Sequence, residues 1–208
     1  ARMAADRMWD TAAQAPWKRR IADLRAAWWE RIRAETSRPL HEAPMEPPLV
    51  AKLLSEAVPP SAVIALDTGD HTVWFHRVFE NRGQRVLLSG RHRTLGFALP
   101  AAIAAQLAEP ERPVVAVAGD GGVVQTLMEF RTAAKLELPV VLVVLNNGAY
   151  AMELNQMMGA GLAPLGAALD NPDFVRIAEG CGGIGKRAEN GEALARALAE
   201  AFRAGRPR

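Results

Sequence analysis

Two short polar segments in this sequence carry side chains suited to binding a charged ligand. Asp120 lies among glycines in Gly119–Gly122, and Asn147 lies in the segment 146–149, which reads Asn-Asn-Gly-Ala. Each segment directly follows an apolar run with the character of a β-strand. Carboxylate and amide oxygens are hard ligands of the kind that Mg²⁺ prefers, and glycines let a phosphate approach the backbone closely. Asp-Gly and Asn-Gly are also common turn dipeptides, so either segment alone could be a plain turn.

The elements that must position these segments form an alternating pattern of strands and helices. Continuous apolar strands separated by helical segments favour a parallel sheet that is covered on both faces. We therefore predict an α/β fold with a doubly wound parallel sheet and helices on both faces. In such a sheet, the polar segments after the strands lie where ligands usually bind. The predicted strands are Val63–Leu66, Val86–Leu88, Val114–Val117, Val140–Leu145 and, near the end, Ile184–Ala188, which is followed by a helix over Glu192–Arg203.

The first part of the chain has a different character. Apolar residues at helical spacing, from Ile21 to Ile32, predict an amphipathic helix. The segment 38–48 contains four prolines and no periodicity, which is typical of a linker. We therefore expect residues 1–44 to form a helical segment with a proline-rich linker, and residues 45–208 to form the α/β domain.

Composition excludes several classes of protein. The formal net charge is +2 and the basic and acidic residues are intermixed, which argues against nucleic acid as a partner. The single cysteine, Cys181, cannot form an internal disulfide, and no apolar run approaches the length of a membrane span. These features lead us to expect a cytoplasmic protein.

Three longer stretches resemble one known family. The series "GDG", "LMEFRTAAKLELP" and "VVLVVLNNG" resembles the diphosphate-binding signature of thiamine diphosphate enzymes. "ALDTGDHTVW" and "TLGFALPAAIAAQLAEPERPVVAVAGDGG" are similar to the segments that precede this signature in acetolactate synthases and pyruvate oxidases. The resemblance implies a C-terminal thiamine diphosphate-binding domain over about residues 45–205.

The resemblance assigns site residues by position. It implies that Asp120, the Asn147 side-chain oxygen and the Ala149 carbonyl ligate Mg²⁺, which bridges to the diphosphate. Leu95 stands where the family has a bulky apolar residue that wedges under the cofactor. The implied cofactor-binding residues are Leu95, Gly119, Asp120, Gly121, Gly122, Asn147, Ala149 and Tyr150.

Two histidines are candidate catalytic residues. His71 matches a loop position that faces the cofactor or substrate in the family, although a histidine after a turn can also be simply solvated. His92 lies in the cluster Arg91–Arg93, which departs from the small, glycine-rich loop usual at this position. Its cationic and titratable side chains would either hold an anionic substrate or point to water.

The resemblance also implies parts beyond this sequence. Family members activate the cofactor with a glutamate on an N-terminal domain, usually that of a neighbouring subunit. We therefore expect a fragment of a longer, homo-oligomeric enzyme in which residues 1–44 are the tail of a middle domain. Whether that enzyme also holds FAD stays open.

The expected function is decarboxylation of pyruvate or a related 2-keto acid with transfer of the two-carbon unit, as in acetolactate synthases. Pyruvate oxidase or quinone-linked pyruvate dehydrogenase activity is the first alternative, and benzoylformate decarboxylase-like chemistry is the second. A non-catalytic regulatory domain that binds Mg²⁺ and a diphosphate is an alternative of another class. Such a domain has no need of an apolar wedge at Leu95, so the presence of Leu95 favours the enzyme.

The 208-residue chain by itself is expected to show no turnover of pyruvate, because the resemblance places the activating glutamate on another domain. Carbon dioxide release can be measured with purified chain, Mg²⁺ and thiamine diphosphate. Sustained release would show that the chain carries a complete active site.

Overall fold

The computed structural model describes residues 14–203 and separates into two compact units, Ala1–Arg38 and Pro39–Arg208. The described part of the first unit is one long helix, α2 (Ala15–Glu35), which contains the helix predicted over 21–32. A proline lies in its first turn, where the missing N–H costs nothing. At its end, the Thr36 hydroxyl donates to the Ile32 carbonyl over 2.8 Å. Residues 1–13 of the predicted helical segment lie outside the described range.

The second unit is built on a four-stranded, fully parallel sheet. Its strands are β1 (Val63–Leu66), β2 (Arg85–Leu88), β3 (Val114–Gly119) and β4 (Val140–Leu145). They lie in the order β2-β1-β3-β4. The predicted parallel sheet and its first four strands are confirmed.

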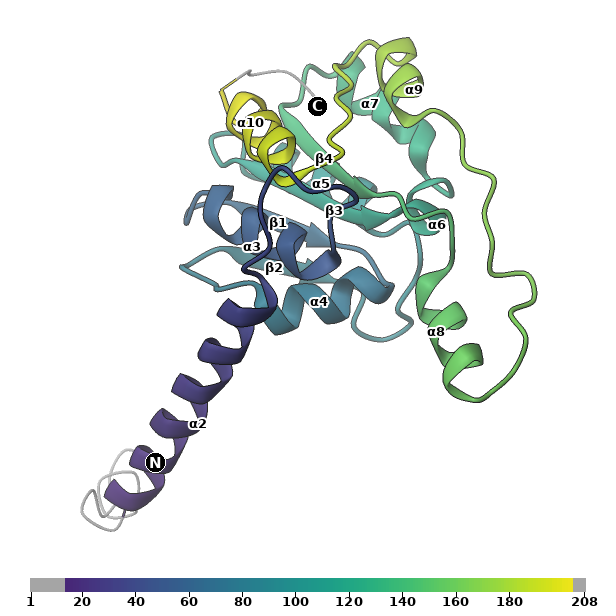
Figure 1. Cartoon of the computed structure of the whole chain (residues 1–208). Helices are drawn as coiled ribbons and strands as arrows, with labels where there is room; N and C mark the ends of the chain where they lie inside the picture. Colours follow the sequence, from purple (N-terminus) through teal and green to yellow (C-terminus); the bar gives the residue numbers. More distant parts are fainter. Residues whose placement is uncertain (1–13, 204–208) are drawn as a thin grey trace. The chain divides into compact units, whose positions relative to one another are not determined.

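Helices cover both faces of this sheet, as Figure 1 shows. The helices α3 (Pro47–Ala57), α4 (Asp70–Val78) and α10 (Gly191–Ala201) share a core cluster with one set of alternate strand residues. Helix α5 (Ala98–Ala108) packs on the opposite set. A third cluster joins α5 to α7 (Phe130–Lys135) and α9 (Phe174–Gly180). Because β1, β3 and β4 are apolar on both sides, each can bury both sets, which is why these runs do not alternate with polar residues.

The chain reverses its direction of travel across the sheet between β1 and β3. From β1 it moves outward to β2, and it then returns over β1 through α5 to form β3 on the other side. The carboxyl ends of β1 and β3 are therefore neighbours from which the connections lead in opposite directions. Such a switch point leaves a crevice in which open α/β sheets bind ligands.

One sequence prediction about local structure is wrong. The predicted strand Ile184–Ala188 does not form; residues of this segment line a cavity together with residues of β4 without pairing with them. After β3 the chain forms a single helical turn, α6 (Asp120–Val123), a 3₁₀ turn, η1 (Leu127–Glu129), and then α7. The helical N–H groups near Asp120 therefore belong to the single turn α6 and not to a long helix.

The proline-rich segment 38–48 also includes the start of a helix. Pro47 and Pro48 occupy the first turn of α3, where proline is well tolerated. Helix α8 (Ala151–Gly159) has no buried residue and stands off from the sheet with the loop that follows it (Figure 1). Within residues 14–203, none of the helices combines the length and the apolar character required to cross a bilayer.

Phe130, at the start of α7, is 1% exposed and has the largest of the fully buried side chains within the described residues. Replacing Phe130 with Ala should lower the free energy of unfolding by about 3–5 kcal/mol, because the cavity left in the core refills only partly. Met128, two residues earlier, is 69% exposed, so Met128→Ala should change stability little. Urea unfolding of both variants measures the difference, and equal effects would contradict this packing.

Candidate functional site

A cavity of about 750 Å³ lies beside the carboxyl ends of the strands. One wall is made by the turns after β1, β3 and β4, together with Leu95 and the start of α8. Residues of the segment 184–189 and of α10 also line the cavity. The cavity brings together the two polar segments that the sequence singled out, Gly119–Gly122 and the asparagine turn 146–149.

Asp120 is the centre of this arrangement and is 2% exposed. Its Oδ2 accepts backbone N–H groups from Asn147 at 3.1 Å and from Gly148 at 2.7 Å. The side-chain amide of Asn171 donates to the same oxygen over 2.7 Å. Oδ1 accepts the N–H of Gly121 at 2.9 Å. The buried carboxylate is thus stabilised by N–H donors from three separate segments of the chain.

The oxygen atoms around Asp120 fit a divalent cation in type. Asn147 contributes an amide Oδ1, which accepts the Ala149 N–H at 3.2 Å, and Ala149 itself lines the cavity. Across residues 14–203, no three His, Cys, Asp or Glu side chains gather as a metal centre. A cation at Asp120 would therefore depend on amide and backbone oxygens and on oxygens of its ligand, a donor set that Mg²⁺ accepts.

Gly121 leaves room that an aromatic ring fills. A Cβ at this position would lie 2.3 Å from Cε1 of Tyr150, which is closer than atoms can approach. The Tyr150 ring therefore packs against the backbone of the turn that holds Asp120. Any larger residue at position 121 would displace the ring.

Asp67 is a second buried carboxylate that the sequence analysis missed. It ends β1, is 1% exposed, and its Oδ1 accepts the N–H groups of Thr68 at 2.7 Å and Gly96 at 3.1 Å. Its Oδ2 accepts the N–H of Ala98 at 3.1 Å. Asp67 thereby fixes the loop before α5 at the end of β1. Its partners are backbone groups about thirty positions away, so no local pattern marks it.

Leu95 is held in the cavity wall by this network. Its neighbour Gly96 donates to Asp67, and the Gly96 carbonyl accepts the Thr126 hydroxyl at 3.0 Å. Gly96 has φ of +78°, a conformation that favours glycine. Leu95 therefore projects from a loop that is tied down on both sides, which suits a residue that supports a bound ligand.

His71 lies in the cavity wall at the start of α4 and is 7% exposed. Burial lowers the pKa of its imidazole below the ordinary value of 6.5, although the carboxylates of Asp67, Asp70 and Asp120 oppose this shift. Its Nε2 is buried and has no hydrogen-bond partner within the described residues. A buried polar atom without a partner lacks a hydrogen bond, so its place beside a cavity calls for an explanation.

The structure separates the two histidine candidates. His71 lines the cavity, whereas His92 is exposed in the loop after β2 and is not among the lining residues. Arg91 and Arg93 beside it are also exposed, and Arg93 has φ of +48°. A substrate role for His92 therefore stays a prediction from the sequence.

Comparisons with known proteins agree with this geometry. Residues 67–208 match the family described as thiamine pyrophosphate enzyme, C-terminal TPP binding domain. The Bacillus subtilis (strain 168) protein named "Putative thiamine pyrophosphate-containing protein YdaP" is 36% identical over 181 residues, covering 86% of the chain and 31% of that protein. Acetolactate synthase of the same strain is 35% identical over 159 residues, covering 76% and 28%.

A solved structure gives the same relationship. The thiamine diphosphate-dependent 4-hydroxybenzoylformate decarboxylase of Rhodococcus jostii RHA1 has a TM-score of 0.68 and 29% identity, covering 80% of the chain and 32% of that protein. The chain therefore spans about a third of the length of the relatives that it matches.

The lowered pKa of His71 predicts a pH dependence of stability. Below pH 6.5 the unfolded chain takes up a proton that the buried imidazole resists, so the free energy of unfolding should fall as the pH falls. The loss is at most about 1.4 kcal/mol per pH unit and ends below the folded-state pKa. Urea unfolding at pH 7.5 and 5.5 should show a smaller decline for His71→Gln than for the wild type. An imidazole titration by NMR with a midpoint above 6.5 would contradict the shift.

Proposed function

Because the chain belongs to the thiamine pyrophosphate enzyme family, we propose that its α/β unit binds the diphosphate of thiamine diphosphate through Mg²⁺ at Asp120. The observation that carries this proposal is the meeting of Asp120 and the asparagine turn at hydrogen-bond distance. The carboxylate of Asp120 is buried and accepts N–H groups from the turn after a neighbouring strand. A metal ligand must be held in this way, because its oxygens have to keep a fixed geometry.

Each site residue has a distinct part in this proposal. Asp120 and the Asn147 side-chain oxygen hold the cation together with the Ala149 carbonyl. Gly119, Gly121 and Gly122 form the turn whose backbone would receive the diphosphate. Leu95 supports the cofactor from the opposite loop, and Tyr150 closes the turn from the side of α8.

The reaction class follows from the cofactor. Thiamine diphosphate, when bound, supplies the electron sink for breaking the bond to the carboxylate of a 2-keto acid. His71 lines the cavity and has a buried, unpartnered Nε2, and the lowered pKa of its imidazole favours the neutral form, so it adds no charge to the site. Apolar side chains of β4 and α10 line the same cavity.

We favour decarboxylation of pyruvate or a related 2-keto acid with transfer of the two-carbon unit, as the name of the Bacillus subtilis acetolactate synthase relative suggests. The chain would work within a longer homo-oligomeric enzyme, where another subunit's N-terminal domain completes the cofactor site. A place in the cytoplasm fits this chemistry. The substrate is then a small molecule, and neither nucleic acid nor a membrane is required.

Simple decarboxylation is the second candidate. It is supported by the structural neighbour, which is named as a decarboxylase of an aromatic 2-keto acid. Oxidation of the two-carbon unit, with FAD as an additional cofactor, is the remaining alternative. Product analysis of the longer enzyme distinguishes the three, because acetolactate, an aldehyde and an oxidised acid are different compounds.

Removing the carboxylate tests the site itself. Asp120→Ala should abolish Mg²⁺-dependent binding of thiamine diphosphate, because phosphate charge then has no cation to bridge it to the protein. Asp120→Asn keeps an oxygen and should weaken binding less, and Asn147→Ala should fall between wild type and Asp120→Ala. Calorimetry with and without chelator measures these affinities on the enzyme that carries the chain.

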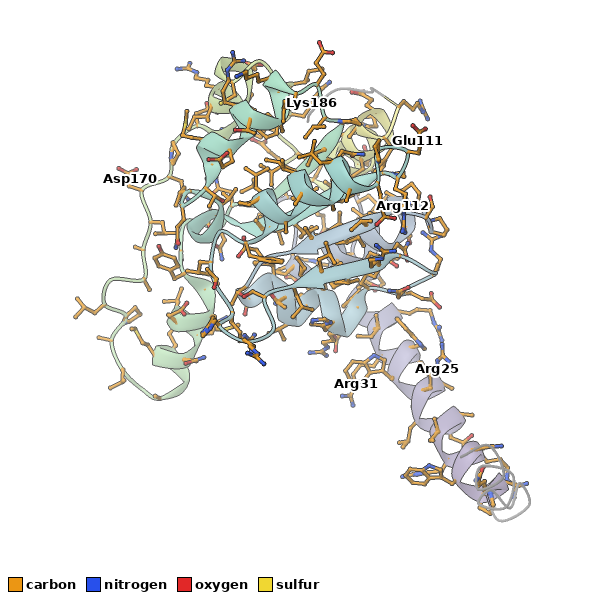
Figure 2. The ribbon with its side chains drawn as sticks, turned by 180° about the vertical axis from the view of Figure 1, so that it is seen from behind. Arg25, Arg31, Glu111, Arg112, Asp170 and Lys186 are labelled. Carbon is orange, nitrogen blue, oxygen red and sulfur yellow. The ribbon has the colours of Figure 1, made fainter. Side chains whose placement is uncertain are left out.

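The matched control is Asp170→Ala, which removes an exposed carboxylate that points away from the sheet (Figure 2). Its Mg²⁺-dependent binding should equal that of the wild type. Wild-type affinity in Asp120→Ala, or binding that chelator leaves unchanged, would show that Asp120 is a turn residue only.

A further inference from the structure

A distant segment of the chain docks directly onto the asparagine turn. The Tyr150 N–H donates to the Ala167 carbonyl and the Leu169 N–H donates to the Gly148 carbonyl, both over 2.8 Å. Ala149 and Ala168 form an antiparallel bridge between these two bonds. The segment 167–171, at the end of the loop after α8, therefore runs alongside the turn that carries Asn147.

Asn171 extends this contact to the buried carboxylate. Its side-chain amide donates to Asp120 Oδ2 over 2.7 Å and to Asn146 Oδ1 over 2.8 Å. Both protons of one amide group are thereby directed at the ends of two different strands. The preceding residue, Asp170, projects away from the sheet in Figure 2, so the two side chains point in opposite directions from the extended chain.

The backbone on the other side of Asn171 is fixed as well. Pro172 follows it and restricts Asn171 to extended conformations. Asp173 then caps α9, since its Oδ1 accepts the N–H groups of Val175 at 3.0 Å and Arg176 at 3.2 Å. Asn171 is therefore held between a two-bond ladder and a helix cap, and its amide reaches Asp120 from a rigid base.

The hydrogen bonds divide the two oxygens of Asp120 unequally. Oδ2 accepts three N–H groups, from Asn147, Gly148 and Asn171, whereas the bond to Oδ1 comes from Gly121. A carboxylate oxygen has about two lone pairs in its plane, so Oδ2 is saturated and Oδ1 keeps capacity for a further ligand. A neutral amide can saturate Oδ2 without repelling a cation, which a lysine or arginine would do.

We propose that Asn171 is a positioning residue for the metal site: its amide fixes the Asp120 carboxylate so that Oδ1 is presented to Mg²⁺. The proposal rests on the function proposed above, in which Asp120 binds the cation. It adds that the segment 167–171 and the cation stabilise each other, because both act on one carboxylate and such coupling is reciprocal. Nothing in the local sequence around Asn171 marks it as part of the site.

The test measures the Mg²⁺ requirement of cofactor binding in the enzyme that carries this chain. Thiamine diphosphate is titrated by calorimetry at a series of Mg²⁺ concentrations. Asn171→Ala should raise the Mg²⁺ concentration needed for half-maximal binding by about ten- to hundredfold, as loss of a residue that orients a metal ligand does. At saturating Mg²⁺, cofactor affinity should return close to wild type, because Asn171 itself does not contact the diphosphate.

A second variant and a control separate positioning from folding. Asn146→Ala removes one acceptor of the Asn171 amide and should raise the Mg²⁺ requirement by a smaller factor. Asn155→Ala removes an amide on α8 that donates to Asp70 over 3.3 Å, outside the Asp120 network, and should leave the Mg²⁺ requirement unchanged. The metal-free melting temperature of Asn171→Ala should stay within a few degrees of wild type.

The outcomes distinguish this proposal from the proposed function. If wild-type enzyme binds thiamine diphosphate without any dependence on Mg²⁺, the function assigned to Asp120 fails. If wild type depends on Mg²⁺ and Asn171→Ala has the same requirement, the positioning role fails while the function stands. A loss of affinity in Asn171→Ala that saturating Mg²⁺ does not restore would also overturn the positioning role.

Discussion

Burial of one negative charge at Asp120 organises this edge of the sheet. A carboxylate at 2% exposure loses nearly all of its hydration and must recover it from the protein. It does so from N–H donors of its own turn, of the turn after β4 and of the segment before α9. None of these donors carries a formal charge, so the site keeps the negative charge of the carboxylate. In the proposed function this charge binds the cation, and the donors keep the carboxylate aligned for it.

Asp67, at the end of the neighbouring strand, is also a buried carboxylate that accepts N–H groups, but its role differs. Its oxygens accept the N–H groups of Thr68 in the turn after β1, of Gly96 in the loop before α5 and of Ala98 at the start of α5. The carboxylate therefore organises backbone and leaves Leu95 projecting into the cavity. The two aspartates end adjacent parallel strands, and the topology places them on either side of the switch point.

The imidazole of His71 is close enough to both carboxylates to feel their charge, yet its pKa is lowered, which favours the neutral form. Three carboxylates favour its protonation, but removing an imidazolium from water costs more, so burial decides the direction of the shift. The glycines at positions 69 and 119 make this burial possible, because a Cβ at either would lie within 3.2 Å of the imidazole. Close packing of backbone against the ring is thus the reason that His71 offers a hydrogen-bonding atom without a charge.

The sequence by itself determined the parallel sheet, its four strands and the approach of Asp120 to Asn147. The strands follow from the apolar pattern within each segment. The approach of Asp120 to Asn147 follows from the general rule that the carboxyl ends of parallel strands lie at one edge of the sheet. Only the tertiary structure revealed Asp67 and Asn171, because their partners lie far along the chain: Asp67 accepts backbone N–H groups about thirty residues away, and the Asn171 amide donates to the side chain of Asp120 about fifty residues away. It also decided that Ile184–Ala188 forms no strand, since a strand requires an adjacent strand to bond with and this segment lines a cavity together with β4 without pairing with it. The apolar pattern of a segment depends on its own residues, whereas its hydrogen-bond partners depend on which other segments the fold places beside it.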